Sequence, residues 1–346
     1  MRFSYILSAI ALATSVTAQQ QACNGYSALC AKPYNQLVSA CTHNAYAFSP
    51  PGGIATNQVN DIPTQLNDGI RAFMLDAYNL PSGDTTDIQL CHTACNLLDG
   101  GPLSKTLGQI KAFMDKNPNE VITILWENSQ NLTPARFQTV YAAAGLVAYS
   151  HAQTPGAAAW PTLSQMISSG KRLVSFVDSG AAASVPWLMA EYDFVFETPY
   201  NIVTGSPYPC TIDRPKGQKK PMYVLNHFVS GQFQLGTNTI SIPQPKIANV
   251  TNAAELADHV ANCQKVLKQT PNFIAVDFYE KGDLMKVVAQ ANGVKWNGKN
   301  STDPTSGSGS GSDSGSGSKN SALGTYLVNA KALGMAVVMA VGLAAL

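Results

Sequence analysis

Residues 121–127 read Val-Ile-Thr-Ile-Leu-Trp-Glu, a nearly unbroken apolar run that stops at an acidic residue. A short run of this kind, without clean alternation, is typical of a strand buried on both faces of a parallel sheet. The same pattern recurs along the chain, and each run ends at a polar residue. The eight runs are 37–42, 71–75, 88–91, 121–126, 173–177, 194–196, 222–225 and 273–276.

Helix-like segments separate most of these runs. Residues 103–117 and 253–270 repeat their apolar side chains at helical spacing, which predicts amphipathic helices. Strands that alternate with helices indicate an α/β fold, and eight of them within one domain predict a (β/α)₈ TIM barrel. We expect the barrel to be irregular, because residues 77–87 are barely long enough for a parallel crossover. The alternative, an open doubly wound sheet, would need a Gly-rich nucleotide-binding turn that is not visible here.

The chain is poor in charge. Its 346 residues include 22 Lys and Arg and 21 Asp and Glu, so 12% are charged and the formal net charge is +1. Soluble domains typically reach about 25%. A nearly neutral chain lacks the basic field that a nucleic-acid-binding protein needs, so we expect no nucleic-acid partner. We also expect a monomer.

The residue patterns at both ends of the sequence are typical of processing signals. Residues 1–18 combine Arg2, an apolar stretch and the small residues of a cleavage site, which predicts a signal peptide and secretion. We expect the barrel domain to occupy residues 19–298. Residues 299–320 are rich in Ser and Gly and predict a flexible stalk.

Residues 321–346 comprise small residues, a spacer and a terminal apolar tail, the pattern of a GPI-attachment propeptide. We expect a GPI lipid on Asn320, which would hold the protein on the plasma membrane or in the cell wall at the cell surface. The alternative is a C-terminal transmembrane helix, for which the apolar tail 332–346 is short.

Seven cysteines fit disulfide chemistry in an oxidising compartment, with one left over. Proximity in sequence suggests Cys23–Cys30 and Cys91–Cys95, and Cys210–Cys263 could join two later loops. Cys41, inside an apolar run, is the candidate for the free thiol. A zinc site is a weaker alternative, because no paired Cys-x-x-Cys or matching His spacing is present.

Three Asn-x-Ser/Thr sequons are candidate glycosylation sites on the surface. They begin at Asn131, Asn249 and Asn300. Pro134 directly follows the first sequon, which makes that site the weakest of the three.

The polar residues at the ends of the apolar runs would meet at one mouth of a barrel, where such enzymes place their chemistry. They are His43, Asn44, Asp76, His92, Glu127, Glu197 and Asp277. Two histidines can act as general base and general acid, which suits cleavage of a phosphodiester by an internal hydroxyl. The charge that develops on the phosphoryl group needs a cation. Asn44, Asp76 and Glu127 offer the oxygen ligands that Ca²⁺ or Mg²⁺ prefers.

Five segments in order resemble the X region of phosphatidylinositol-specific phospholipase C. They are 42–46 (Thr-His-Asn-Ala-Tyr), 69–76, 90–92, 121–128 and 272–279. The chain is most similar to a fungal and plant branch of secreted, single-domain phospholipase C-like phosphodiesterases. The resemblance covers roughly residues 28–295 and implies an irregular TIM barrel that hydrolyses a phosphoinositide or related phosphodiester headgroup of a membrane lipid.

The resemblance implies a role for each matching residue. His43 resembles the base that activates the inositol 2-hydroxyl, and His92 the acid. Asp277 lies where bacterial members hold a carboxylate that orients the base. Asn44, Asp76 and Glu127 resemble the Ca²⁺ ligands of the eukaryotic enzymes.

The chain departs from both branches of the family at Met74. Eukaryotic members have a glutamate ligand there and bacterial members an aspartate, and bacterial members place an arginine where Asp76 stands. A Ca²⁺ or Mg²⁺ cofactor would therefore have an incomplete set of ligands.

Further residues at the mouth are candidate substrate contacts. Asp178 and Glu197 could bind substrate hydroxyls, although salt bridges in loops would explain them as well. Tyr200 could contact a lipid or a ring, although a tyrosine often packs with one end in water.

Two other functions remain open. One is a glycerophosphodiester phosphodiesterase, a family in which a Glu and an Asp normally stand two residues apart on the second strand. Met74 breaks that pair. The other is a cell-surface barrel protein with impaired catalysis, which Met74 favours and the two histidines oppose.

Overall fold

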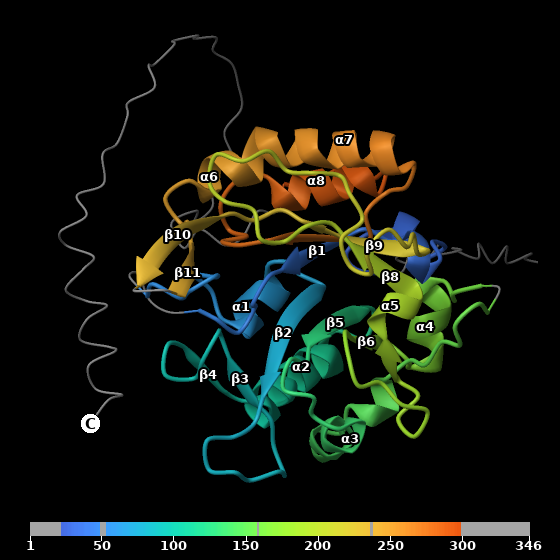
Figure 1. Cartoon of the computed structure of the whole chain (residues 1–346). Helices are drawn as coiled ribbons and strands as arrows, with labels where there is room; N and C mark the ends of the chain where they lie inside the picture. Colours follow the sequence, from blue (N-terminus) through green and yellow to red (C-terminus); the bar gives the residue numbers. More distant parts are fainter. Residues whose placement is uncertain (1–21, 49–52, 158, 236–237, 299–346) are drawn as a thin grey trace, which may run out of the picture.

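The computed structural model describes residues 22–48, 53–157, 159–235 and 238–298. Its main sheet contains eight parallel strands, which curl around a common interior (Figure 1). They are β1 (Ser39–Thr42), β2 (Ala72–Tyr78), β5 (Ile122–Glu127), β6 (Leu173–Val177), β7 (Leu188–Ala190), β8 (Val195–Glu197), β9 (Met222–Asn226) and β12 (Phe273–Val276).

The strands pair in the order β7-β6-β5-β2-β1-β12-β9-β8. The expected α/β class and irregular (β/α)₈ barrel are thus confirmed. In the described part of the chain no ladder joins β7 to β8, so the barrel is open along that line.

The prediction of one barrel strand is wrong. The run at 88–91 forms β3 (Gln89–Cys91), which pairs antiparallel to β2 and to β4 (Asp99–Pro102). The physical reason is the short connection before it, which lets the chain fold back but leaves no room for a parallel crossover. The eighth parallel strand is instead β7, which the sequence pattern did not predict.

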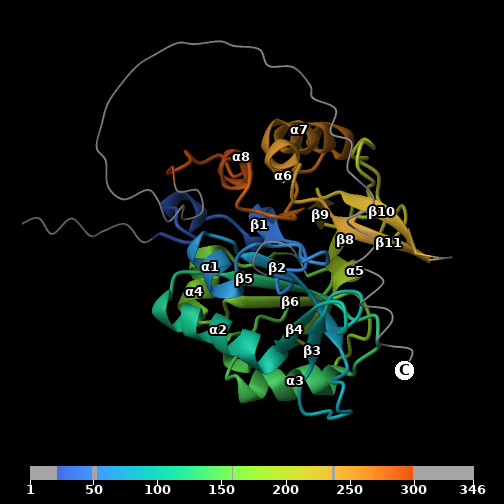
Figure 2. The same ribbon diagram turned by 90° about the vertical axis from the view of Figure 1, so that its left-hand side faces the viewer.

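Helices cover the outside of the curled sheet (Figure 2). The expected helices at 103–117 and 253–270 are α2 (Leu103–Lys116) and α7 (Leu256–Leu267). The remaining helices are α1 (Ile62–Asn67), α3 (Pro134–Ala143), α4 (Leu163–Ser169), α5 (Glu191–Phe194), α6 (Ala248–Val250) and α8 (Leu284–Ala291). Short 3₁₀ turns lie at Ser27–Leu29, Tyr34–Gln36 and Val147–Tyr149, and a π turn at Thr251–Glu255 precedes α7.

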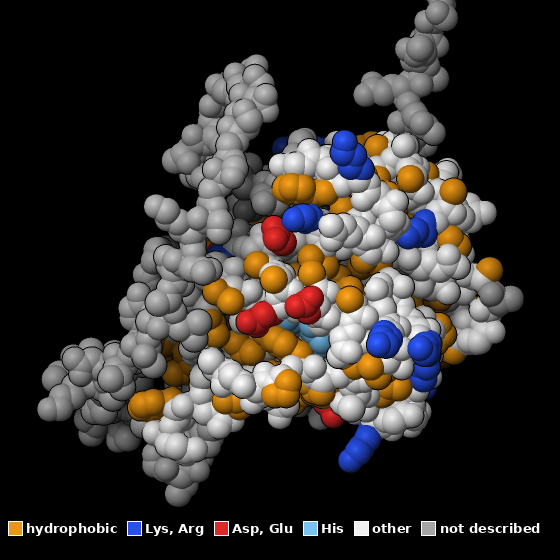
Figure 3. Space-filling model, turned by 90° about the horizontal axis from the view of Figure 1, so that it is seen from above, with side chains coloured by type: hydrophobic (Ala, Val, Ile, Leu, Met, Phe, Trp, Pro, Cys, Tyr) orange, Lys and Arg blue, Asp and Glu red, His pale blue; other side chains and the backbone are white. Residues whose placement is uncertain are grey.

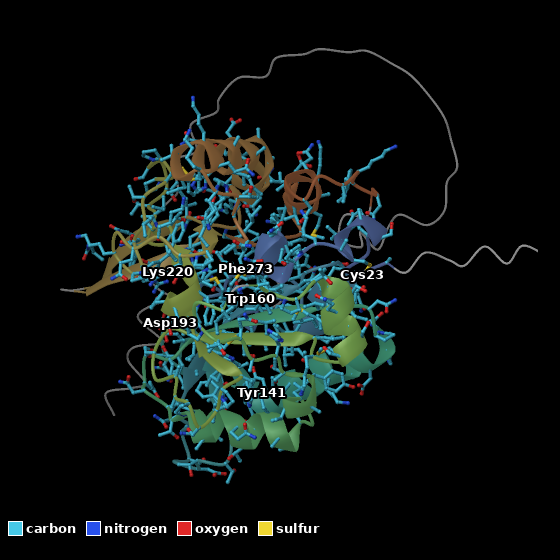
Figure 4. All side chains as sticks on the ribbon, turned by 90° about the vertical axis from the view of Figure 1, so that its right-hand side faces the viewer. Cys23, Tyr141, Trp160, Asp193, Lys220 and Phe273 are labelled. Carbon is cyan, nitrogen blue, oxygen red and sulfur yellow. A yellow bond between two sulfur atoms is a disulfide. The ribbon has the colours of Figure 1, made fainter. Side chains whose placement is uncertain are left out.

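Alternation along each strand separates two cores and fixes which polar residues face inward. On β2, Phe73 and Leu75 join the core between sheet and helices, whereas Ala72 and Met74 belong to the core inside the barrel. Asp76 is next in the inward series. Figure 4 labels Phe273 in the middle of the molecule, where it belongs to the inner core, and Tyr141 in the helical layer outside the sheet.

A two-stranded antiparallel hairpin, β10 (Ser230–Leu235) and β11 (Asn238–Pro243), stands apart from the main sheet (Figure 1). It directly follows β9 in the chain. Ser230, Ser241 and Pro243 line a cavity at the end of the barrel, so the hairpin forms one wall of the mouth.

The three expected disulfides are confirmed. Cys23–Cys30, Cys91–Cys95 and Cys210–Cys263 are bonded, and Cys41 is free and buried in the inner core. Among the described residues, Cys210 and Cys263 with His259 form the single group of three metal-ligating side chains within 4.8 Å of one another. Because the two sulfurs are bonded to each other, they are not thiolate ligands for zinc.

Several predicted features lie outside the described residues: the signal peptide, the stalk, the GPI-attachment segment with Asn320, and the sequon at Asn300. Asn131 and Asn249 are exposed, as an attached glycan requires. None of the described helices has the length and apolar character needed to cross a membrane.

Candidate active site

Two adjoining cavities open at the carboxyl ends of the barrel strands. We call them the histidine cavity, of about 750 Å³, and the acidic cavity, of about 430 Å³. The histidine cavity holds His92 and Asp277, and the acidic cavity holds Asp178 and Glu197. Six residues line both: His43, Asn44, Asp76, Glu127, Tyr200 and Phe228. All nine residues that the sequence singled out for catalysis, substrate or metal therefore meet here, and their individual roles stay predictions.

His43 is held in one orientation by polar contacts. Its Nδ1 lies 2.8 Å from Asp277 Oδ1, and Asn57 Nδ2 donates to the same carboxylate oxygen at 3.0 Å. Because an ionised carboxylate can only accept, Nδ1 carries the proton and donates it to Asp277. This leaves the lone pair of Nε2 available for a substrate proton.

The ring of Phe228 fixes the plane of the His43 imidazole. The two rings stack with centroids 3.8 Å apart and planes within 3° of each other. Gln58 Nε2 donates to the carbonyls of His43 and Val276, at 2.7 and 3.1 Å. These two hydrogen bonds tie the ends of β1 and β12 together.

His92 reaches the histidine cavity from the antiparallel strand β3. Its Nδ1 donates to the carbonyl of Ala55 at 2.6 Å, which leaves Nε2 for the substrate. The preceding residue is fixed by the Cys91–Cys95 disulfide and by Tyr46 Oη, which donates to the Cys91 carbonyl at 2.8 Å. The second histidine is therefore rigidly placed even though its strand is not part of the barrel.

The pKa values of the two histidines shift in opposite directions. Burial alone would lower the pKa of His43, but the charge and hydrogen bond of Asp277, with the charges of Asp76 and Glu127, outweigh it and raise the pKa. Burial lowers the pKa of His92.

Asp76 and Glu127 are direct neighbours across the parallel ladder of β2 and β5. Burial, followed by the negative charge of Glu127, raises the pKa of Asp76 to about 8. Burial also raises the pKa of Glu127. Two carboxylates on neighbouring strands, of which Asp76 is buried, disfavour each other's charge. A bound cation would relieve this repulsion.

The donor set at this point fits a hard divalent cation. Asn44, which takes a φ of 44° that asparagine tolerates, lies at the mouth beside Asp76 and Glu127. Its Nδ2 donates to Asn57 at 3.4 Å, so its side-chain oxygen is left for other partners. Carboxylate and amide oxygens are the ligands of Ca²⁺ and Mg²⁺. Met74 lines the acidic cavity but offers only a thioether.

Glu197 and Asp178 face the acidic cavity with part of their bonding capacity already used. Glu197 accepts from Arg214 Nη2 at 2.8 Å, from Asn226 Nδ2 at 3.0 Å and from Tyr192 Oη at 3.2 Å. Asp178 Oδ1 accepts from the backbone N–H of Asn128 at 2.9 Å.

Tyr200 is exposed at the rim, and the guanidinium of Arg214 lies 4.2 Å from the centre of its ring. This stacking is a cation–π contact. Arg214 therefore joins Tyr200 at the rim to Glu197 in the cavity.

Sequence reasoning missed several residues of the site, among them Asn57, Glu191, Arg214 and Phe228. Asn57 and Arg214 lie in loops, where no periodicity marks them. Glu191 is buried in the four-residue helix α5. Of these residues, only Phe228 has a sequence signal: it follows the end of β9 by two positions.

Figure 3 shows one face of the molecule, seen from above the view of Figure 1. Lys and Arg side chains are scattered over this face and do not merge into a basic patch.

Comparison with known proteins gives a consistent result. The family model described as PI-PLC X 1 matches residues 29–292. An uncharacterized secreted protein of Arthroderma benhamiae is 34% identical over 296 residues, which cover 80% of this chain and 65% of that protein. PI-PLC X domain-containing protein 1 of the same organism is 32% identical over 299 residues, 84% of this chain and 95% of the relative.

Among solved structures, a phosphatidylinositol-specific phospholipase C from Listeria monocytogenes aligns with 18% identity and a TM-score of 0.48. The alignment covers 76% of this chain and 95% of that one.

Proposed function

The chain belongs to the PI-PLC X family, and from this premise we propose that it is an extracellular phosphodiesterase of the phospholipase C type. Its substrate would be a membrane lipid with a phosphoinositide-like headgroup. One observation carries the proposal: His43, bonded to Asp277 at 2.8 Å, lines the same cavity as His92. Each imidazole engages Nδ1 with a protein oxygen, which leaves Nε2 for a base and an acid acting on one phosphodiester.

In the proposed reaction, Nε2 of His43 removes the proton from a hydroxyl of the headgroup. The hydroxyl oxygen attacks phosphorus and forms a cyclic phosphodiester, while the bond from phosphorus to the glycerol oxygen breaks. His92 Nε2 gives a proton to that leaving oxygen. Asp277 keeps His43 in the correct tautomer and stabilises the imidazolium that forms.

The anionic phosphodiester favours the protonated form of an imidazole beside it. Burial lowers the pKa of His92 in the free protein, and the charge of the bound substrate acts in the opposite direction. Substrate binding therefore provides the protonated acid that the leaving oxygen needs.

A divalent cation is part of the proposal. Asn44, Asp76 and Glu127 would hold Ca²⁺ or Mg²⁺ with three protein oxygens, and water and the substrate would provide the other ligands. When bound, the ion would neutralise charge that develops on the phosphoryl oxygens.

We further propose that the protein acts as a monomer at the cell surface. Three disulfides fit an oxidising compartment, and a relative is named as a secreted protein. The GPI-attachment pattern of the sequence would place the barrel next to its lipid substrate.

The test is release of a water-soluble cyclic phosphodiester of the headgroup from lipid vesicles by the purified protein. We expect His43→Ala and His92→Ala each to lower the rate by about a hundredfold or more. His151→Ala, which replaces a histidine outside both cavities, is the matched control. Full activity in either active-site variant would refute the mechanism, and no release by the wild type would support a non-catalytic barrel.

A further inference from the structure

Asn57 is a buried amide beside the His43–Asp277 pair, and the proposed reaction gives it no role. It comes from the loop between β1 and α1 and is only 1% exposed, although it borders the histidine cavity. A buried amide is stable only where its oxygen and nitrogen find hydrogen-bond partners, so those partners show which groups it holds in place.

The backbone of Asn57 is fixed from two sides. Its N–H donates to the carbonyl of Ala47 at 2.9 Å, and its carbonyl accepts from the N–H of Phe278 at 2.8 Å. Ala47 lies in the segment that follows β1, and Phe278 lies two residues beyond β12. These are the two strands whose ends carry His43 and Asp277. The loop therefore holds the Asn57 amide at a set place relative to both.

The nitrogen end of the amide belongs to Asp277. Asn57 Nδ2 donates to Asp277 Oδ1 at 3.0 Å, and His43 Nδ1 donates to the same oxygen at 2.8 Å. The two nitrogens lie 3.3 Å apart, and because each donates to the carboxylate, neither accepts from the other. Two donors on one oxygen restrict the rotation of the carboxylate, so Asn57 fixes the acceptor that orients His43.

The oxygen end of the amide faces Asn44. Because Nδ2 of Asn57 is turned to Asp277, its Oδ1 accepts from Asn44 Nδ2, at 3.4 Å. The donors therefore run in one direction, from Asn44 through Asn57 to Asp277. A cation at the proposed site would not compete with this chain, because it would bind the side-chain oxygen of Asn44 and not the nitrogen.

We propose that Asn57 is a positioning residue, whose amide holds Asp277 against His43 and orients the amide of Asn44. The inference rests on the proposed function for the roles of these three neighbours. Asn57 acts on the reaction through Asp277 and not by binding substrate. Its loss should therefore lower kcat and leave KM nearly unchanged.

The experiment combines two substitutions. Asn57→Leu keeps a side chain of similar shape and removes both polar ends. On vesicles it should lower kcat by about tenfold or more, the scale of one hydrogen bond to a charged group, and change KM by less than about twofold. In the Asp277→Asn background the same substitution should lower kcat by less than about threefold, because the residue through which Asn57 acts is already altered.

Equal losses of kcat in the two backgrounds, or a loss confined to KM, would overturn the inference while the proposed function stands. Asn57→Ala, which is smaller and leaves room for water, repeats the comparison if the leucine variant does not fold.

Asn272→Leu is the matched control. Asn272 is 3% exposed, lines neither cavity, and donates from Nδ2 to the carbonyls of Asn35 and Leu37 at 2.9 and 3.1 Å. It directly precedes β12, at the opposite end from Asp277. Its loss should lower the free energy of unfolding but not kcat. A loss of kcat as large as that of Asn57→Leu would show a general effect of burial and would overturn the inference.

A second readout needs no catalysis. A ring proton held in a fixed hydrogen bond exchanges slowly with water, so the Nδ1–H of His43 should give a resolved NMR signal that His43→Ala removes. The signal should persist in Asn272→Leu and broaden or disappear in Asn57→Leu. If no lipid is hydrolysed, the proposed function fails and this measurement tests Asn57 alone. No signal in the wild type, or an unchanged signal in Asn57→Leu, would overturn the inference.

Discussion

His43 and Asp277 are 234 positions apart in the chain, and their side chains are joined by a hydrogen bond of 2.8 Å. This hydrogen bond results from the pairing of two neighbouring strands in the sheet. β1 and β12 are parallel neighbours in which Thr42 pairs with Val276, and each of the two polar residues directly follows its strand. The pairing of the first barrel strand with the last, rather than any local motif, therefore creates the His–Asp pair.

Replacing Asp277 with asparagine should lower kcat by about a hundredfold or more. An amide can donate to Nδ1 of His43, which would stabilise the wrong tautomer and take the lone pair away from Nε2. KM should change little, because Asp277 acts on substrate through His43. Steady-state kinetics on vesicles would measure both constants.

Asp258→Asn, on the exposed face of α7, is the control for loss of a negative charge. Circular dichroism should show that both variants are folded. A loss confined to KM in the Asp277 variant would contradict its role in orienting the base.

The carboxyl ends of the barrel strands were predictable, because a strand buried on both faces is apolar and the first polar residue marks the point where it leaves the core. Six of the eight runs became barrel strands with small changes in their ends, and a seventh, 194–196, did so after Phe194 was taken into α5. Asp76 and Glu127 were identified because each stands at such an end, where alternation turns the side chain inward.

The strands and site residues that the sequence did not predict are determined by tertiary packing. β7 has only three residues, too few to show a periodic pattern. β3 resembled a barrel strand because an apolar run indicates that a strand is buried but not whether it is parallel or antiparallel to its neighbours. Asn57 and Arg214 come from loops whose course is set by contacts with distant segments. No local pattern distinguishes such residues from other loop residues.

Replacing Met74 with aspartate should create a tighter cation site. Met74 belongs to the inward series of β2 with Asp76 and lines the same cavity, so a carboxylate there would add an oxygen ligand. We expect Ca²⁺ affinity to rise by about tenfold or more, measured by titration calorimetry. Because a third carboxylate would crowd Asp76 and Glu127, the variant should be less stable than wild type when a chelator is present.

Asp76→Asn provides the opposite change and should weaken Ca²⁺ binding. A variant at an exposed site, Asp115→Asn, should leave binding unchanged. Equal affinity in the Met74 and Asp76 variants would show that the cation, if bound at all, lies elsewhere.

The Cys210–Cys263 disulfide closes a loop of 53 residues that carries Arg214, β9 and the β10–β11 hairpin. Replacing both cysteines with alanine should lower the free energy of unfolding by about 4 kcal/mol, from the loop entropy that the unfolded chain regains. Urea titration would measure the loss. The Cys23–Cys30 pair closes a loop of only 7 residues, so its removal should cost less.

The last prediction concerns two buried histidines, His227 and His259, whose Nδ1 atoms lie 3.0 Å apart. Burial lowers the pKa of His227 to about 4, and burial with the neighbouring His227 lowers the pKa of His259 to about 3. The ordinary value is 6.5, so below that pH the unfolded chain binds protons that the folded chain refuses.

The stability from these two histidines is therefore complete above pH 6.5 and is lost as the pH falls towards 4. Within this window each histidine should contribute a slope of about 1.4 kcal/mol per pH unit. The double variant His227→Gln/His259→Gln lacks the pH dependence of stability that comes from the two histidines. The carboxylates of the active site titrate alike in the wild type and in this variant. Subtracting its unfolding free energies from those of wild type between pH 7 and 4 isolates the pair. A difference that stays constant with pH would show that the histidines are not held neutral by burial.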